Sequence, residues 1–262
     1  MIRRVPPMLL PAMLLPAMLV LLCGAAAPEG PVLVPEVSQH VIHVEQGFTG
    51  ADLLLYGAIL TPEGQPVDSD YDIVVVVEGP PRAVVVREKR QVAGVWVNAA
   101  SSRFRSAPGF FAVASSRPVA GIVDARTASI YELGLSFLQL SPIGSIDPAH
   151  EAPFARGLVA HMQRMGLYHE DPQAVTISHR VLYQARIALP SSVPTGDYTA
   201  ETFAIRQGRV LASGITRIRV DKQGFARLIA DRAEHAGLAY GLCAVALSVA
   251  MGWIAGRLFA RV

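Results

Sequence analysis

The sequence predicts a mainly β protein: an exported, immunoglobulin-like β-sandwich with a helical insertion, followed by one C-terminal transmembrane helix. Three observations predict this class. Runs rich in β-branched residues recur between Gly and Pro turns, this pattern stops between about residues 118 and 172, and residues 237–256 carry no charge. An apolar helix of roughly 20 residues is long enough to cross the ~30 Å hydrocarbon core of a bilayer.

Residues 1–27 are predicted to be a secretory signal peptide. Arg3 and Arg4 precede an apolar run that ends in small residues. Removal of this segment takes away Cys23 and leaves Cys243 as the only cysteine, so the exported domain, residues 28–221, is expected to be stabilised by its core without disulfides. The formal net charge of +2 gives no reason to expect a nucleic-acid partner.

The strand pattern begins near residue 37 and continues to about residue 115. Both side-chain parities are apolar in residues 73–77 and again in 92–97, which predicts two strands that are buried on both faces. A hairpin is predicted between strands at 83–87 and 92–98, joined across residues 88–91.

The helical insertion, residues 118–172, contains one amphipathic helix, predicted over residues 152–165. Pro153 lies in its expected first turn and Gly166 follows as a stop. Its apolar face is predicted to cover one face of the sheet, and it carries Phe154, Leu158, His161, Met162 and Met165.

Strands resume after the insertion and end in a hairpin. Residues 189–214 combine a Pro/Gly loop, a strand that begins with a tyrosine and the turn Gln207-Gly208. This order is typical of the terminal hairpin of an immunoglobulin-like sandwich.

The end of the chain predicts its membrane topology. A juxtamembrane helix is expected at 222–236, the transmembrane helix at 237–256 and a cytoplasmic tail at 257–262. Arg257 and Arg261 follow the apolar run, whereas charges of both signs precede it, so the positive-inside rule predicts a cytoplasmic C-terminus. The large domain is then expected in the periplasm, on a single-pass protein of a bacterial inner membrane.

Small residues recur every three or four positions along one side of this apolar segment. Such a stripe lets a second transmembrane helix approach closely, although Gly and Ala are also common in membrane helices generally. The stripe and its second G-x-x-x-G pair consist of Gly237, Gly241, Ala244, Ser248, Gly252, Ala255 and Gly256.

The sequence contains no recognisable catalytic or nucleotide-binding motif, and we predict no catalytic residue, metal ligand or cofactor. The run His169-Glu170-Asp171 is explained equally well by a polar helix boundary. Asp52 stands alone in an apolar run, where a carboxylate that accepts backbone hydrogen bonds at a turn is the simpler interpretation. A positive rim for an anion is a candidate site, with scattered solvated side chains as the alternative; it would consist of Arg82, Arg87, Arg90, Arg103, Arg105 and Arg117.

Several long strings resemble a family of alphaproteobacterial putative transmembrane proteins. They are GFTGADLLLYGAIL, DIVVVVEGPPRAVVVREKRQVAGVWVN, PGFFAVASSRPV, PFARGLVAHMQRMGLY and VPTGDYTAETF, which together cover most of the chain from about residue 35. The resemblance implies a signal peptide, an exported domain, one C-terminal span and an association with a multipass permease of the sulfite-exporter type. It implies no catalytic residues.

The function predicted from these observations is that of a non-enzymatic, membrane-anchored periplasmic accessory protein and partner of a multipass permease. A second copy of the chain is the alternative partner for the membrane helix. Two other classes stay open: a periplasmic module that binds an anion or other ligand, and an enzyme with an unfamiliar site.

Overall fold

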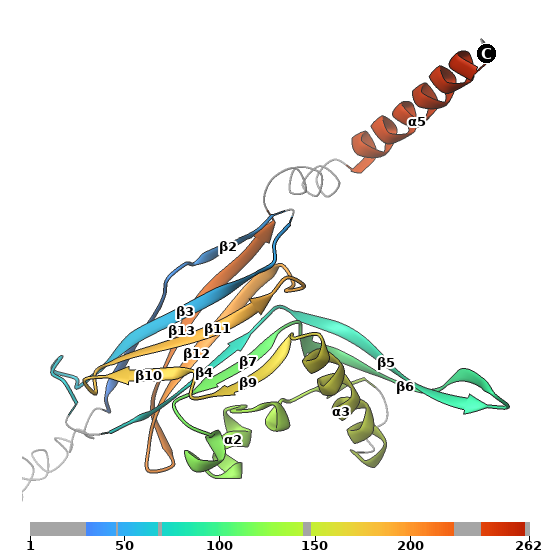
Figure 1. Cartoon of the computed structure of the whole chain (residues 1–262). Helices are drawn as coiled ribbons and strands as arrows, with labels where there is room; N and C mark the ends of the chain where they lie inside the picture. Colours follow the sequence, from blue (N-terminus) through green and yellow to red (C-terminus); the bar gives the residue numbers. More distant parts are fainter. Residues whose placement is uncertain (1–29, 46, 68–69, 144–147, 223–236, 260–262) are drawn as a thin grey trace, which may run out of the picture.

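The computed structural model describes residues 30–45, 47–67, 70–143, 148–222 and 237–259, and it is mainly β (Figure 1). The predicted signal peptide lies outside the described residues, as does the predicted juxtamembrane helix except for Lys222, which ends a strand.

Two sheets form the body of the protein. The smaller has four antiparallel strands in the order β1 (Val32–Val37), β3 (Gly50–Leu60), β11 (Leu182–Pro190) and β10 (Val175–Ser178). The larger has the order β2 (Val41–Val44), β13 (Arg209–Lys222), β12 (Gly196–Arg206), β4 (Asp72–Glu78), β7 (Phe111–Ser115) and β9 (Tyr168–Pro172). Its edge strands β2 and β9 pair in parallel with their neighbours, and its other pairs are antiparallel.

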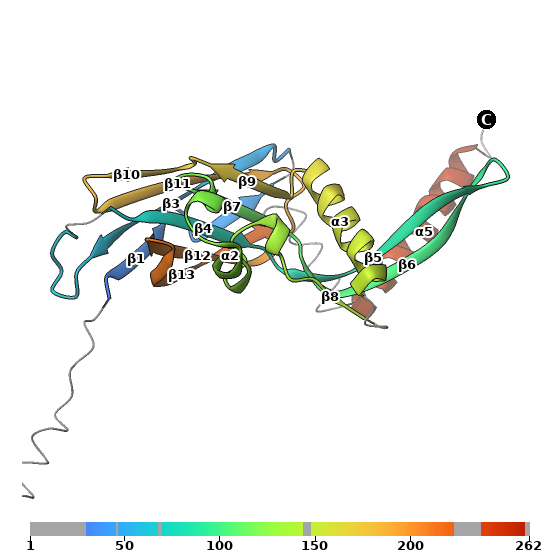
Figure 2. The ribbon, with the colours of Figure 1, turned by 90° about the horizontal axis from the view of Figure 1, so that it is seen from below.

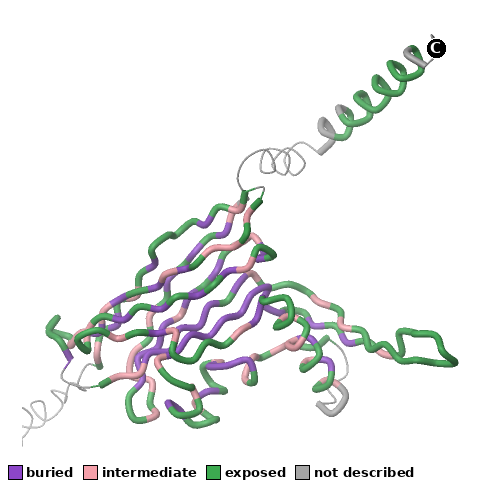
Figure 3. Tube along the Cα trace, viewed as in Figure 1, coloured by how far each residue is buried: buried purple, intermediate pink, exposed green. Residues whose placement is uncertain are grey.

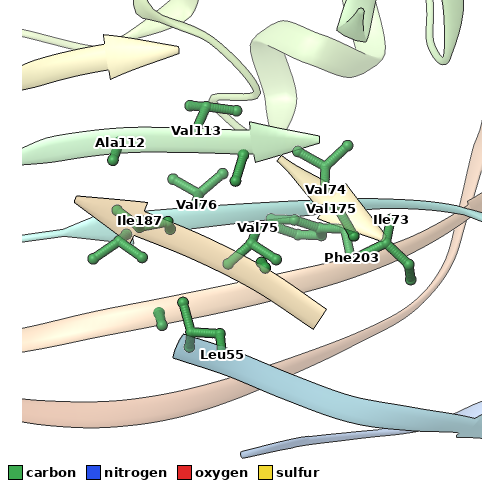
Figure 4. Packing of buried hydrophobic residues seen from close by; sticks show 14 of the residues in the cluster. Leu55, Ile73, Val74, Val75, Val76, Ala112, Val113, Val175, Ile187 and Phe203 are labelled. Atoms are coloured by element: carbon green, nitrogen blue, oxygen red, sulfur yellow. The ribbon is translucent and has the colours of Figure 1, made fainter. Parts of the chain in front are cut away.

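The core lies on both faces of β4, as its doubly apolar sequence predicts. All five residues from Ile73 to Val77 are buried. In Figure 4, Val75 points toward Leu55 and Ile187 of the smaller sheet, whereas Val76 points to the opposite face. A strand buried on both faces needs cover on both, and the second face requires another element.

The first part of the insertion provides that cover. It consists of η1 (Val119–Gly121), α2 (Ala125–Ile130) and η2 (Leu135–Phe137), beneath β4 and β7 in Figure 1. Ile122, Ala128 and Leu133 are buried in the same core cluster as β4. The segment begins after a buried strand and is capped by Asp124, whose carboxylate accepts from the Thr127 backbone N–H at 2.8 Å.

The predicted amphipathic helix is present as α3 (Pro148–Arg164) and contacts the edge of the larger sheet, but it does not cover the middle of that sheet as predicted. It begins four residues earlier than predicted and packs on β5, β6 and β9 instead of covering β4. Phe154 and Leu158 are buried in a separate apolar cluster, whereas His161 and Met165 of the predicted face are exposed.

The strands β5 (Pro81–Val92) and β6 (Val95–Pro108) form a long ribbon, which continues the antiparallel pair β4 and β7 beyond the end of the larger sheet (Figures 1 and 2). The short strand β8 (Ser141–Pro142) pairs with β6 near the root. The predicted hairpin loop at 88–91 was wrong, because those residues are paired strand and the chain turns at Ala93-Gly94, with φ of 49° and 82°. Two consecutive residues with positive φ match the right-handed twist of a two-residue hairpin.

The terminal hairpin β12–β13 turns at Gln207-Gly208, as predicted, with φ of 51° and 77°. Beyond it, α5 (Gly237–Phe259) is a helix of 23 residues. Within the part of the chain that the structure describes, no helix is both long enough and apolar enough to cross a membrane.

Candidate functional site: a basic ribbon beyond the sheet

The ribbon of β5 and β6 is the most unusual feature of the surface. It carries six basic side chains and one carboxylate, hence a net charge of +5 where the whole chain has +2. Five of the six arginines of the predicted rim lie on it, namely Arg82, Arg87, Arg90, Arg103 and Arg105, all exposed. Their common location depends on strand pairing, for example Arg103 of β6 opposite Val85 of β5.

The root of the ribbon is bent and firmly held. Gly79 donates its backbone N–H to the Phe110 carbonyl at 2.8 Å, and Gly109 donates to the Pro80 carbonyl at 2.9 Å. The buried Tyr168 hydroxyl donates to the Pro108 carbonyl at 2.7 Å. The segments Gly79-Pro80-Pro81 and Pro108-Gly109 therefore form the bend where β4 gives way to β5 and β6 gives way to β7.

Helix α3 covers the half of the ribbon nearest the sheet. Phe154 and Leu158 pack against Phe104 and Ala107, and all four are at most 6% exposed. The buried Ser102 hydroxyl donates to the Glu151 carboxylate at 2.5 Å, which ties the first turn of α3 to β6. A small hydrophobic core therefore holds this half of the ribbon against α3.

The outer half of the ribbon has no such cover. Every residue from 87 to 99 is exposed (Figure 3), including Val92 at 54%, Val95 at 64% and Trp96 at 66%. The prediction that residues 92–97 form a strand buried on both faces was therefore wrong. These residues are largely apolar and do form strand, but no neighbouring element of the described structure packs on them.

The sixth arginine of the predicted rim lies elsewhere. Arg117 follows β7 and forms a bidentate ion pair with Asp72. The Nε–Oδ1 distance is 2.8 Å and the Nη2–Oδ2 distance is 2.7 Å. Its hydrogen bonds hold the pKa of the Asp72 carboxyl below its usual value, against the opposing effect of burial. Arg117 also donates to the Gly121 carbonyl, so it joins β4 to the start of the insertion.

A groove between the two sheets collects the acidic and imidazole groups that the sequence singled out. Its volume is about 270 Å³, and its polar lining comes from Asp52 of β3, Arg186 of β11, and His169 and Asp171 of β9. Burial lowers the pKa of His169, while the charge of Asp171 opposes that effect. The edge of the ring contacts Phe110, with centroids 5.6 Å apart.

A second cavity, of about 420 Å³, lies under the insertion. Its walls are mainly apolar, with Val113, Val123 and Phe137 among them, and Glu170 and Asp171 at one side. Glu170 accepts a hydrogen bond from the Leu135 backbone N–H, so its carboxylate helps to hold η2 in place. Among the described residues, no three His, Cys, Asp or Glu side chains are grouped closely enough to hold a metal ion.

The small-residue stripe lies on α5. An added Cβ at Gly241, Gly252 or Gly256 would meet no atom within 4 Å beyond the neighbouring backbone of its own helix, and Ser248 donates to the Ala244 carbonyl at 2.9 Å. Ala255 is exposed, and the exposure of Gly237 is not described.

Sequence reasoning found the arginines but missed the ribbon on which they lie. The available signal was VREKRQVAGVWVN, in which valines flank a small Ala-Gly turn while basic residues lie just before them. An apolar run without alternation is usually buried, so the pattern of these residues predicts core. The run of charges before them was the sign that this hairpin leaves the sheet.

Comparison with known proteins places the chain in a family. No curated protein matches it. The family described as "Putative transmembrane protein (Alph_Pro_TM)" matches residues 32–261, which include both sheets, the ribbon, the insertion and α5. The chain therefore belongs to this family of putative transmembrane proteins.

Proposed function

We propose that this protein is a non-enzymatic accessory protein, anchored by α5 in a bacterial inner membrane with its β domain in the periplasm. The observation that carries the proposal is the exposed ribbon, which projects beyond the sheet as a contact surface and encloses no pocket among the cavities described above. Membership of a putative transmembrane family supports the anchor.

The features of α5 support its assignment as the span. Residues 237–256 are uncharged, and the helix continues to Phe259. Near its end, the Arg257 guanidinium lies over the Trp253 ring, 5.1 Å from the centroid. Trp and Arg are enriched at the cytoplasmic boundary of membrane helices, so this pair fits the end of the span that the charge asymmetry assigns to the cytoplasm.

The β domain is proposed to be immunoglobulin-like. Tyr198 lies near the start of β12, and its buried hydroxyl donates to the Pro194 carbonyl, four residues earlier, at 2.6 Å. A tyrosine whose hydroxyl returns to the preceding backbone at this point of the terminal hairpin is a hallmark of immunoglobulin-like sandwiches.

The proposed partner of α5 is a multipass permease of the sulfite-exporter type, with self-association as the alternative. The open glycines 241, 252 and 256 leave space in which another helix could approach closely. In this arrangement the ribbon would lie beside the permease on the periplasmic side of the membrane.

Cross-linking from the stripe tests this proposal. In a Cys243→Ala background of the full chain, Ser248→Cys should give an adduct with the co-expressed permease, and Val249→Cys should not. Adding Gly252→Leu should abolish the adduct, because the larger side chain holds the helices apart. A dimer-sized adduct alone would support self-association, and no adduct together with full function of the Gly252→Leu variant would contradict both partners.

The gathering of five arginines on one ribbon also favours a second candidate, a module that binds anions. Sulfite, sulfate or an organosulfonate should then raise the melting temperature of the protein in a saturable manner. Arg103→Gln should remove that rise if the ribbon holds the anion, whereas Arg117→Gln should leave it intact.

A further inference from the structure

The outer half of the ribbon ends in an apolar tip without cover. Val92 and Val95 flank the Ala93-Gly94 turn, and Trp96 and Val97 follow, with exposed fractions between 41% and 66%. Isolated exposed apolar residues are common, but four large ones within six positions at the end of a projecting hairpin form a patch that needs an explanation.

The tip carries large apolar side chains on both faces of the ribbon, with Gln91 beside Trp96 and Arg90 beside Val97. Val92 pairs with Val95, and Gln91 pairs with Trp96. Because successive side chains of a strand point to opposite faces, the valines 92, 95 and 97 share one face and Trp96 lies on the other. A protein surface would cover one face of such a ribbon, whereas an apolar medium that surrounds the tip contacts both.

Basic side chains lie directly behind the tip. Lys89 is three residues and Arg87 five residues before Val92, which places them about 10 and 17 Å back along the strand. Arg90 pairs with Glu88 at 3.1 Å, so Lys89 and Arg87 carry the net positive charge of this collar. Interfacial segments bury their apolar side chains about 5–10 Å deep, at the boundary of headgroups and acyl chains, so a collar at this distance lies level with the headgroups or just outside them.

The ribbon leaves the sheet at the end that leads to α5. Glu78, the last residue of β4, pairs with Thr199 of β12, which pairs with Arg217 of β13. Strand β13 runs on from Arg217 to Lys222 in the same direction, toward the residues that precede α5. The root of the ribbon and the path to the proposed anchor therefore lie at one end of the sheet.

We propose that the tip of this ribbon, Val92, Val95, Trp96 and Val97, inserts into the interfacial layer of a membrane that contains anionic lipids, while Arg87 and Lys89 bind the anionic headgroups. The membrane is the one that holds α5, so the inference rests on the proposed anchor. The β domain would then have two membrane contacts and a defined orientation above the bilayer.

Lipid fits this tip better than a protein partner does. A stable protein interface buries roughly 800 Å² on each partner, far more than four side chains at a hairpin tip provide without neighbouring elements. Interfacial insertion needs only a few apolar side chains and a basic collar, and tryptophan has a known preference for this layer.

Fluorescence of the full chain in vesicles tests the inference. The protein has two tryptophans, so Trp253→Phe leaves Trp96 as the only indole. We would reconstitute this variant into vesicles of phosphatidylcholine and phosphatidylglycerol and measure the quenching of Trp96 by brominated phosphatidylcholine. Carbonate extraction of the same vesicles reports independently whether α5 anchors the chain.

We expect strong quenching in vesicles with phosphatidylglycerol and weaker quenching without it or at high salt. The pair Arg87→Glu and Lys89→Glu should lower the ratio of inserted to free tips by at least about 25-fold, since each basic side chain near an anionic surface is worth about fivefold. The matched control is Arg126→Glu with Arg209→Glu, which makes the same change of charge on exposed residues outside the ribbon and should leave the quenching unchanged.

Three results would overturn the inference. A carbonate-resistant chain whose Trp96 is not quenched would contradict insertion while leaving the anchor intact. Equal quenching in the ribbon and control variants would contradict the role of Arg87 and Lys89. If Trp96 were shielded only in vesicles that also contain the permease, the tip would be assigned to a protein partner. Extraction of the chain by carbonate would instead identify the anchor as the failed premise.

Discussion

Buried tyrosines show how single hydroxyl groups stabilise the junction between sheet and ribbon. Tyr198 and Tyr168 donate to the carbonyls of Pro194 and Pro108, and burial raises the pKa of both phenols. Tyr183 is equally buried, and its hydroxyl forms no hydrogen bond of good geometry; the neighbouring Thr202 hydroxyl only opposes the rise that burial causes in the pKa of this phenol. The three phenols therefore differ in partners while sharing the same burial.

Removal of these hydroxyls should have different effects. Tyr198→Phe leaves the Pro194 carbonyl without its donor and should lower the free energy of unfolding by about 1–2 kcal/mol. Tyr183→Phe removes a buried polar group without a partner and should be neutral or slightly stabilising. Urea unfolding of the full chain in detergent would measure both, and equal losses would show that the Tyr183 hydroxyl is in fact bonded.

The Asp72–Arg117 ion pair predicts a pH dependence. The pKa of Asp72 is lower in the folded protein than its usual value of 3.8, mainly through hydrogen bonds from Arg117. The pair therefore stabilises the fold above pH 3.8, and this contribution is lost as the pH falls through the lowered pKa. Asp72→Asn should reduce the free energy of unfolding by about 1 kcal/mol at pH 7 and make no difference in strong acid.

The control for this titration is the more exposed pair of Asp70 and Arg180, at 3.0 Å with side chains 85% and 61% exposed. Asp70→Asn should change stability little at either pH, because solvent screens the pair. If the two variants behaved alike at pH 7, the Asp72–Arg117 pair would be no more than an ordinary surface contact.

Helix α3 and the ribbon root should depend on each other. Leu158 is 3% exposed against Phe104 and Ala107, so Leu158→Asp places a charge without a partner in the cluster and should destabilise it by several kcal/mol. The same change at Met165, which is 44% exposed, should have little effect.

Hydrogen exchange can locate that loss. In the Leu158→Asp variant, amides of β5 and β6 near the root should exchange much faster, while those of β4 and β12 stay protected. The reason is that the buried residues of the α3 cluster are not part of the core of the two sheets, although Met162 packs against both. Uniform loss of protection would instead mean that α3 is required for the whole domain.

At the scale of the whole molecule, the prediction is its membrane topology. With α5 as the span and Arg257 and Arg261 on the inner side, protease added to spheroplasts should digest the β domain. A tag at the C-terminus should be degraded only after the membrane is opened. Protection of the domain together with cleavage of the tag would reverse the orientation, and digestion of both would show that the chain does not cross the membrane.

The sequence alone predicted those elements whose structure depends mainly on their own residues. The doubly apolar run 73–77, the turn Gln207-Gly208 and the amphipathic pattern of α3 each predicted a real element. The extent of the arginine rim, the partner of α3 and the part of the insertion that covers β4 could not be predicted, because each depends on contacts between segments far apart in sequence.

The sequence by itself determined that the protein is mainly β and that it belongs to its family, because long strings of residues carry that membership. Only the tertiary structure decided that residues 73–77 are core and 92–97 are surface, although both runs are apolar. The physical reason is that burial requires a neighbour. Strand β4 has the smaller sheet on one face and the insertion on the other, whereas the ribbon bends at residues 79–81 and 108–109, and none of the described elements covers its tip.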